Sequence, residues 1–112
     1  MATNKKILKK TILTVGGKDY ALELPFKNAK KLERVLGGSI LKVLMNVEED
    51  LVDFDFISAT IRFALAKHNG EMTEDEVDDL IQDYIDEGNS VVDLMTLAVN
   101  CIQNSGFLGS AK

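Results

Sequence analysis

The spacing of apolar residues changes once along this chain, at its only proline, Pro25. Before it, apolar and polar residues alternate, as at Leu13, Thr14 and Val15, which is the period of a strand with one buried face. After it, apolar residues recur at intervals of three and four, which is the period of an amphipathic helix. The chain is therefore predicted to be α+β and mainly α, with an N-terminal β-hairpin packed on a bundle of four to five helices.

The predicted hairpin runs from about residue 9 to residue 24. Gly16 and Gly17 interrupt the alternation and supply the positive φ angles that a tight hairpin turn needs. The alternation resumes at Tyr20, and Pro25 closes the second strand because it cannot donate a ladder hydrogen bond.

The helical part is predicted over residues 28–104. Its first helix begins at Asn28 and ends at Gly37-Gly38, because glycine readily takes the left-handed conformation found at helix ends. Ser39 is placed to cap a short helix that follows. A single helix kinked at the two glycines is the alternative.

A longer helix is predicted after Asp53, whose side chain can cap it, and it ends at residues 68–70. Apolar residues cover so much of its circumference that the helix belongs at the centre of the domain. Thr73 and Glu76 then form a capping box, in which each side chain accepts a hydrogen bond from a backbone N–H that the helix leaves unpaired. Gly88 ends the acidic, amphipathic helix that this box begins.

A last helix is predicted from Ser90 to about residue 104, followed by a loose tail over residues 105–112. The apolar faces of all these elements are expected to meet in one core. Its predicted members are Leu13, Val15, Leu32, Leu36, Ile57, Ile61, Leu80, Ile81, Tyr84, Leu94 and Met95.

The length of 112 residues leaves room for a single domain, residues 1–112, and for no second, catalytic domain. The single cysteine, Cys101, cannot form an intramolecular disulfide, which fits a reducing compartment such as the bacterial cytoplasm. The basic N-terminus is followed by no apolar run of signal-peptide length, and no stretch approaches the ~20 apolar residues of a membrane helix. A soluble protein that is neither secreted nor bound to a membrane is therefore expected.

Charge is divided unequally along the chain. Residues 1–34 carry nine basic and three acidic side chains, a net charge of +6, whereas residues 35–112 carry four basic and fifteen acidic side chains, a net charge of −11. The acidic part would repel phosphate, so nucleic-acid binding is not expected as the main role.

Two stripes of charge follow the spacing of helical residues that share one face. Each stripe lies on a different predicted helix, and we take both as candidate partner-binding surfaces through which copies could meet head to tail. The alternative is that both are solvated faces, because exposed ion pairs are individually weak. The candidate residues are Lys27, Lys30, Lys31 and Arg34 on the first helix, and Asp75, Asp79, Asp83 and Asp86 on the acidic helix.

Residues 68–76 are similar to the second half of an EF-hand calcium loop. The first two ligand positions of such a loop would fall on Leu65 and Lys67, and neither side chain supplies an oxygen ligand. A turn at Gly70 is therefore the better interpretation. Cys101 and His68 are too few for a zinc site, and a cysteine in an apolar run is typical of a core residue rather than of a nucleophile. The carboxylates of the acidic helix are expected to face solvent, with no apolar pocket to raise a pKa. No catalytic residue, cofactor or metal site is predicted, and no enzymatic activity.

Three segments, in a fixed order, carry a family resemblance. Residues 13–22 hold a short hairpin with the pattern Gly-Lys-x-Tyr, and residues 32–40 hold the pattern Leu-Glu-x-x-Leu-Gly-x-Ser. In residues 72–81, Met-Thr is followed by an acidic run and then by valine and leucine-isoleucine. Together these resemble the tail assembly chaperones of long-tailed phages and prophages of Gram-positive bacteria, over about residues 12–102. Outside the family pattern lie Lys5, Lys6, Lys9 and Lys10, and the aromatic residues Phe54, Phe56 and Phe63.

The resemblance implies a non-enzymatic protein that binds the tape measure protein, keeps its long apolar helices soluble and helps recruit tail tube subunits. It also implies self-association into a ring or spiral, a place in the cytoplasm of the bacterial host, and absence from the mature virion. The alternative is a small acidic regulatory or adaptor protein of phage or bacterial origin, sensing a divalent ion through the turn at Gly70.

Overall fold

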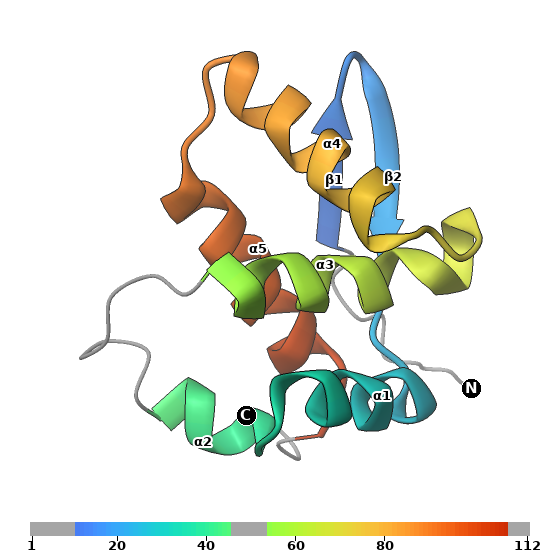
Figure 1. Ribbon diagram of the computed structural model, residues 1–112, viewed down its shortest axis with the longest axis vertical. Helices are drawn as coiled ribbons and strands as arrows, with labels where there is room; N and C mark the ends of the chain where they lie inside the picture. The colour runs from blue at the N-terminus through green and yellow to red at the C-terminus, as the bar shows by residue number, and fades with distance from the viewer. Residues whose placement is uncertain (1–10, 46–53, 108–112) are drawn as a thin grey trace, which may run out of the picture.

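The computed structural model describes residues 11–45 and 54–107 and has the predicted α+β, mainly α architecture. A two-stranded antiparallel hairpin is followed, within those residues, by five helices (Figure 1). The elements are β1 (Thr11–Val15), β2 (Lys18–Leu22), α1 (Phe26–Leu36), α2 (Ile40–Met45), α3 (Phe54–Asn69), α4 (Glu74–Asp86) and α5 (Val91–Asn104).

The hairpin has the predicted turn and the predicted alternation of exposure. Gly16 and Gly17 both have positive φ angles, of 61° and 77°, so they form the two-residue turn that joins tightly paired strands. Leu13 and Val15 face the core, whereas Thr14 between them faces solvent. The first two residues of the predicted hairpin, 9 and 10, lie outside the described residues.

Helix α1 begins at Phe26, two residues before the predicted start at Asn28, and this part of the prediction was wrong. Pro25 is the N-cap, with φ −70° and ψ 160°, and its carbonyl accepts the first helical hydrogen bond from the Ala29 N–H at 2.8 Å. Phe26 and Lys27 are both exposed, so the first turn adds nothing to the apolar period from which the start was predicted.

Two separate helices, rather than one kinked helix, occupy the segment around the paired glycines. Gly37 ends α1 in the left-handed conformation, with φ 75°. Ser39 then caps α2 as predicted, since its hydroxyl accepts a hydrogen bond from the Lys42 N–H at 3.3 Å. The Glu33 carboxylate accepts a second bond, from the Ile40 N–H at 2.8 Å, and so ties α2 to the end of α1.

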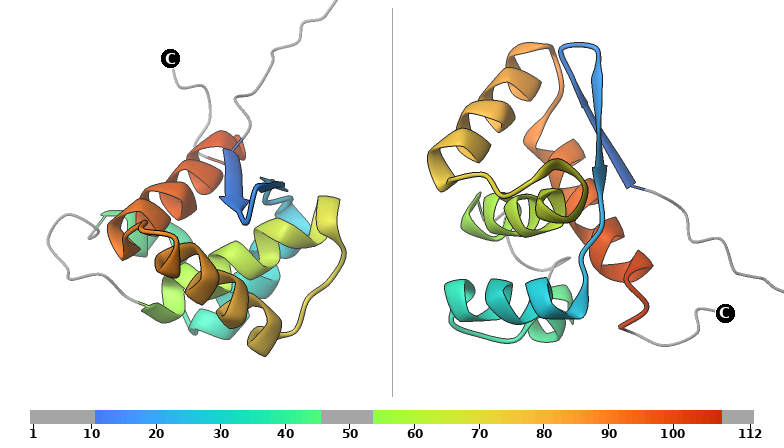
Figure 2. Two further views of the ribbon diagram at one scale, coloured as in Figure 1. Left: turned by 90° about the horizontal axis from the view of Figure 1, so that it is seen from above. Right: turned by 90° about the vertical axis from the view of Figure 1, so that its right-hand side faces the viewer.

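Helix α3 crosses the middle of the molecule, with α1 on one side and α4 on the other (Figures 1 and 2). It also contacts β2 and α5. Ile61, Ala64 and Leu65 are fully buried, which confirms the central position predicted from the apolar circumference. Its predicted cap, Asp53, lies outside the described residues.

Capping boxes begin both C-terminal helices. The predicted box of α4 is confirmed: the Thr73 hydroxyl accepts from the Glu76 N–H at 3.1 Å, and the Glu76 carboxylate accepts from the Thr73 N–H at 2.8 Å. Ser90 and Asp93 exchange the same pair of bonds at the start of α5.

The tail that was predicted to be loose, residues 105–112, is described only as far as Phe107. Phe107 is half-buried and packs against the core. Residues 108–112 lie outside the described residues.

Most of the residues predicted for the core are buried in it. Leu36, Ile81 and Met95 are only partly buried and pack against its edge, whereas the other eight are buried. The core also includes apolar residues that were not among those predicted for it. The largest of these that are fully buried are Leu24, Phe56, Leu65 and Ile102.

Replacing Ile61 by alanine should lower the free energy of unfolding by about 2–5 kcal/mol, because the side chain is fully buried and its removal leaves a cavity in the core. Denaturant melts measure this loss. Ile12→Ala is the matched control, since 38% of Ile12 is exposed and its truncation leaves no cavity. Equal, small losses for both variants would contradict the central position of α3.

Replacing Thr73 by alanine should lower the free energy of unfolding by about 0.5–2 kcal/mol, because the Glu76 N–H loses the hydroxyl that caps it. Thr96→Ala is the control, since Thr96 is an exposed residue inside α5 and alanine is the better helix former there. If thermal melts showed no difference between the two variants, the capping box would contribute nothing to stability.

Candidate interaction surfaces

The predicted basic stripe lies on the outer face of α1. Ala29 and Leu32 turn the opposite face of this helix into the core. Lys27, Lys30 and Arg34 are therefore exposed. The fourth member of the stripe, Lys31, is half-buried at its edge.

An exposed aromatic ring lies at the start of the basic stripe. Phe26 is 69% exposed, and the Lys30 ammonium lies 6.0 Å from the centre of its ring. Phe107 meets the same ring edge-on, with 6.1 Å between ring centres. The outer face of α1 therefore combines positive charge with an apolar residue that the chain itself covers only in part.

The predicted acidic stripe lies on the outer face of α4, because Val77, Leu80 and Tyr84 turn the inner face into the core. All four of its members, Asp75, Asp79, Asp83 and Asp86, are exposed. Carboxylates in the first turn interact favourably with the positive end of the helix dipole, whereas those in the last turn do not. The negative charge of the last turns therefore adds nothing to the stability of the helix and stays available to a partner.

The two stripes lie on opposite sides of α3, so they do not pair within one molecule (Figures 1 and 2). Within residues 11–45 and 54–107, the ion pairs join Glu23 to Lys67 and His68 and involve no residue of either stripe. A basic face at one side of the molecule and an acidic face at the other is the arrangement that head-to-tail contact between copies requires.

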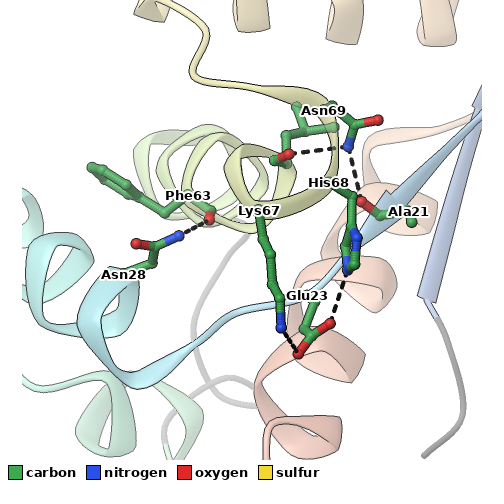
Figure 3. A network of polar contacts seen from close by, with 8 residues as sticks. Ala21, Glu23, Asn28, Phe63, Lys67, His68 and Asn69 are labelled. Carbon is green, nitrogen blue, oxygen red and sulfur yellow. Dashed lines mark hydrogen bonds and ion pairs between the residues drawn. The ribbon is translucent and has the colours of Figure 1, made fainter.

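Glu23 holds the end of β2 against the last turns of α3 (Figure 3). Its carboxylate lies 2.8 Å from the Lys67 ammonium and 2.9 Å from His68 Nε2, and its backbone N–H donates to the Ala64 carbonyl at 3.0 Å. The Lys67 hydrogen bond, followed by that of His68, lowers the pKa of Glu23. The side chains are nearly half exposed, so this cluster positions the hairpin exit and adds little stability.

Asparagine side chains complete the same junction. Asn69 Nδ2 donates to the carbonyls of Ala21 and Leu65, at 3.0 Å each, and Asn28 Nδ2 donates to the Phe63 carbonyl at 3.0 Å (Figure 3). These bonds join β2, α1 and α3 through backbone groups. The sequence analysis missed the two bonds between elements, because their partners lie 35 and 48 residues apart in the chain.

Cys101 and His68 are placed apart, in different surroundings. Cys101 is buried beside Thr11, and burial raises the pKa of its thiol to about 12. The thiol is therefore protonated at neutral pH and is not a nucleophile. His68 lies at the surface, against Glu23.

A groove with an apolar floor opens between the first turns of α3, the length of α4 and the first turn of α5, with a volume of about 380 Å³. Ile57, Ile81, Ile85, Val91 and Leu94 line the floor. Acidic side chains stand at the rim, and the ring of Phe54 beside them is 70% exposed. The sequence analysis singled out Phe54 but missed the groove, which exists only where three helices meet. The acidic residues of its lining are Asp55, Glu74 and Asp78.

Within the described residues, no three histidine, cysteine, aspartate or glutamate side chains gather in a way that could hold a metal ion. In the same part of the chain, no helix has both the length and the apolar character needed to cross a membrane.

Reversing two charges of the basic stripe, as Lys30→Glu with Arg34→Glu, should weaken self-association in low salt, because the outer face of α1 would then repel the acidic face of α4. The size of the native oligomer should also fall as salt rises, since exposed charges are screened over about 8 Å at physiological ionic strength. Light scattering after size exclusion measures both effects.

The control variant is Lys18→Glu with Lys42→Glu, which changes the net charge equally at two exposed lysines outside α1. The contact between stripes is contradicted by a native protein that stays monomeric at high concentration in low salt. The contact between stripes is also contradicted if the size of the oligomer changes neither with salt nor with the charge reversal in α1.

Comparison with known proteins assigns the chain to a family over nearly its whole length. No curated protein and no solved structure matches it significantly. One family model matches residues 5–112, and that family is described as a family of unknown function, DUF6096. The chain belongs to the DUF6096 family.

Proposed function

We propose that this protein is a phage tail assembly chaperone. In this role it binds the tape measure protein, keeps its long apolar helices soluble, and helps recruit tail tube subunits during tail morphogenesis. It acts without enzymatic activity, in the cytoplasm of the bacterial host, and does not remain in the mature virion.

The observation that carries the proposal is the order of the three segments that resemble this family. Each of them falls on a corner of the fold: the turn at Gly16-Gly17, the end of α1 at Gly37, and the capping box at Thr73. Turns and helix ends determine the angle at which successive elements pack. The same order of turn and cap residues in this chain and in the chaperone family therefore supports the same arrangement of hairpin and helices.

Two surfaces fit the proposed role. A chaperone for long apolar helices needs an accessible apolar surface, and the groove between α3, α4 and α5 supplies one. A protein that coats an extended partner also needs contacts between its own copies, and the basic and acidic stripes on opposite sides of α3 suit a ring or spiral. The protonated, buried thiol of Cys101 supports a role without nucleophilic chemistry.

Co-expression with the protein of the neighbouring downstream gene tests the proposal, provided that gene encodes a very long helical protein, as a tape measure must. We expect the long protein to be insoluble by itself, and to become soluble and co-purify with this chain. The groove variant is Ile81→Glu with Ile85→Glu. Its matched control is Asn100→Glu with Gln103→Glu, which adds the same two negative charges at exposed positions of α5 outside the groove. If the long protein were equally soluble without this chain, the proposed function would be wrong.

A calcium titration in a calorimeter separates this function from divalent-ion sensing at the Gly70 turn. A chaperone of this kind should give no stoichiometric heat, whereas a sensor must bind through about 6–8 oxygen ligands and release or take up heat as it does so. Stoichiometric calcium binding that Glu71→Gln abolished would favour the sensor.

A further inference from the structure

The residues that line the groove between α3, α4 and α5 favour one kind of bound segment. Its floor is aliphatic, and three carboxylates, of Asp55, Glu74 and Asp78, stand in its lining. An apolar segment flanked by positive charge would bury its apolar side chains on the floor and place its charges beside the carboxylates. A neutral or acidic segment would leave those carboxylates without partners or repel them.

Three segments of the sequence adjoin the described residues, and they differ in charge. Residues 108–112 contain one leucine and one lysine, too few for both the floor and the acidic lining of the groove. Residues 46–53, which lead into α3, carry four carboxylates and no basic side chain. Their charge is the same as that of the groove, so they are poor occupants. Residues 5–10 have the sequence Lys-Lys-Ile-Leu-Lys-Lys, in which two aliphatic residues stand between two pairs of lysines. This is the composition that the groove requires.

The position of Thr11 limits how residues 5–10 could reach the groove of their own molecule. The Thr11 hydroxyl accepts a hydrogen bond from Asn104 at 3.1 Å, so the strand begins beside the last turn of α5. Leu94 lines the groove from the first turns of α5, and ten residues of helix, about 15 Å, separate it from Asn104. Leu8 is three residues before Thr11 and extends at most about 11 Å from it. Thr11 also lies beside Cys101, which is seven residues of helix, or about 10 Å, from Leu94. Ile7 and Leu8 would therefore reach the floor of their own groove only with the chain almost fully extended along α5, a restriction that a segment from a second copy does not have.

We propose that residues 5–10 of one copy occupy the groove between α3, α4 and α5 of a second copy. Ile7 and Leu8 lie on the aliphatic floor beside Phe54, and the lysines on either side face the acidic rim. The basic cluster at the start of the chain and the exposed ring of Phe54, neither of which belongs to the phage family pattern, then have one explanation. The contact involves this chain only, and an apolar helix of a tape measure protein that used the same groove would have to displace residues 5–10.

A tryptophan in place of Leu8 tests the proposal in the full chain. The protein contains no tryptophan, so the new side chain is the only indole reporter. We expect its emission to shift to shorter wavelength as the protein concentration rises, because a second copy is needed to bury it. High salt should reverse the shift, since part of the attraction is between screened charges.

Two variants of α4 show where the reporter binds. Asp78→Lys with Gln82→Lys places two positive charges in the groove lining and should weaken the association about tenfold, as expected for the reversal or loss of a few exposed charge contacts. Asp79→Lys with Asp83→Lys changes the charge of the same helix by more, outside the groove, and should weaken it less. Circular dichroism of each variant establishes that it is folded.

Three results would overturn the proposal. One is an emission that stays at long wavelength at every concentration. Another is a shift already complete at the lowest concentration, which would place the segment on its own molecule. The third is equal weakening by both pairs of substitutions, which would mean that the segment is attracted to the acidic helix in general and not to the groove.

Discussion

The burial of α3 is the interaction on which the rest of the fold depends. A two-stranded hairpin is marginal by itself in water, and the hairpin here is held by contacts of β2 with α3 and by the bond from the Glu23 N–H to the Ala64 carbonyl. The inner faces of α1, α4 and α5 also pack on α3. One helix thus packs against the apolar faces of β2, α1, α4 and α5, and the outer faces of these helices are left to meet other molecules.

The central position of α3 also keeps the two charged stripes apart. Packed helices lie about 8–10 Å from axis to axis, so α1 and α4, on opposite sides of α3, are separated by about 16–20 Å. That separation exceeds the ~8 Å over which physiological salt screens exposed charges. The stripes therefore exert little force on each other within a molecule, and each is free to attract the opposite stripe of another copy.

The features that could be predicted from the sequence are turns, helix ends and caps, because a few neighbouring residues determine each of them. The turn at Gly16-Gly17, the end of α1 at Gly37 and the cap at Thr73 each depend on fewer than five consecutive residues, and each was predicted at its observed position. The start of α1 was not, because its first turn is exposed and has no apolar period. The Glu23 junction and the groove depend on residues that only the folded chain brings together, so no local pattern could indicate them.

The two contacts that we propose between copies would differ in what each contributes to the affinity. An exposed ion pair is worth about 0.2–1 kcal/mol, whereas full burial of a leucine or isoleucine side chain is worth about 1.5–3 kcal/mol. Apart from Phe26, the basic stripe offers charge only, so it is suited to guiding approach and setting register. The groove can bury two aliphatic side chains and holds the greater share of the affinity. A copy that lost Ile7 and Leu8 but kept its lysines would still approach the acidic side of its neighbour, and it would leave again quickly.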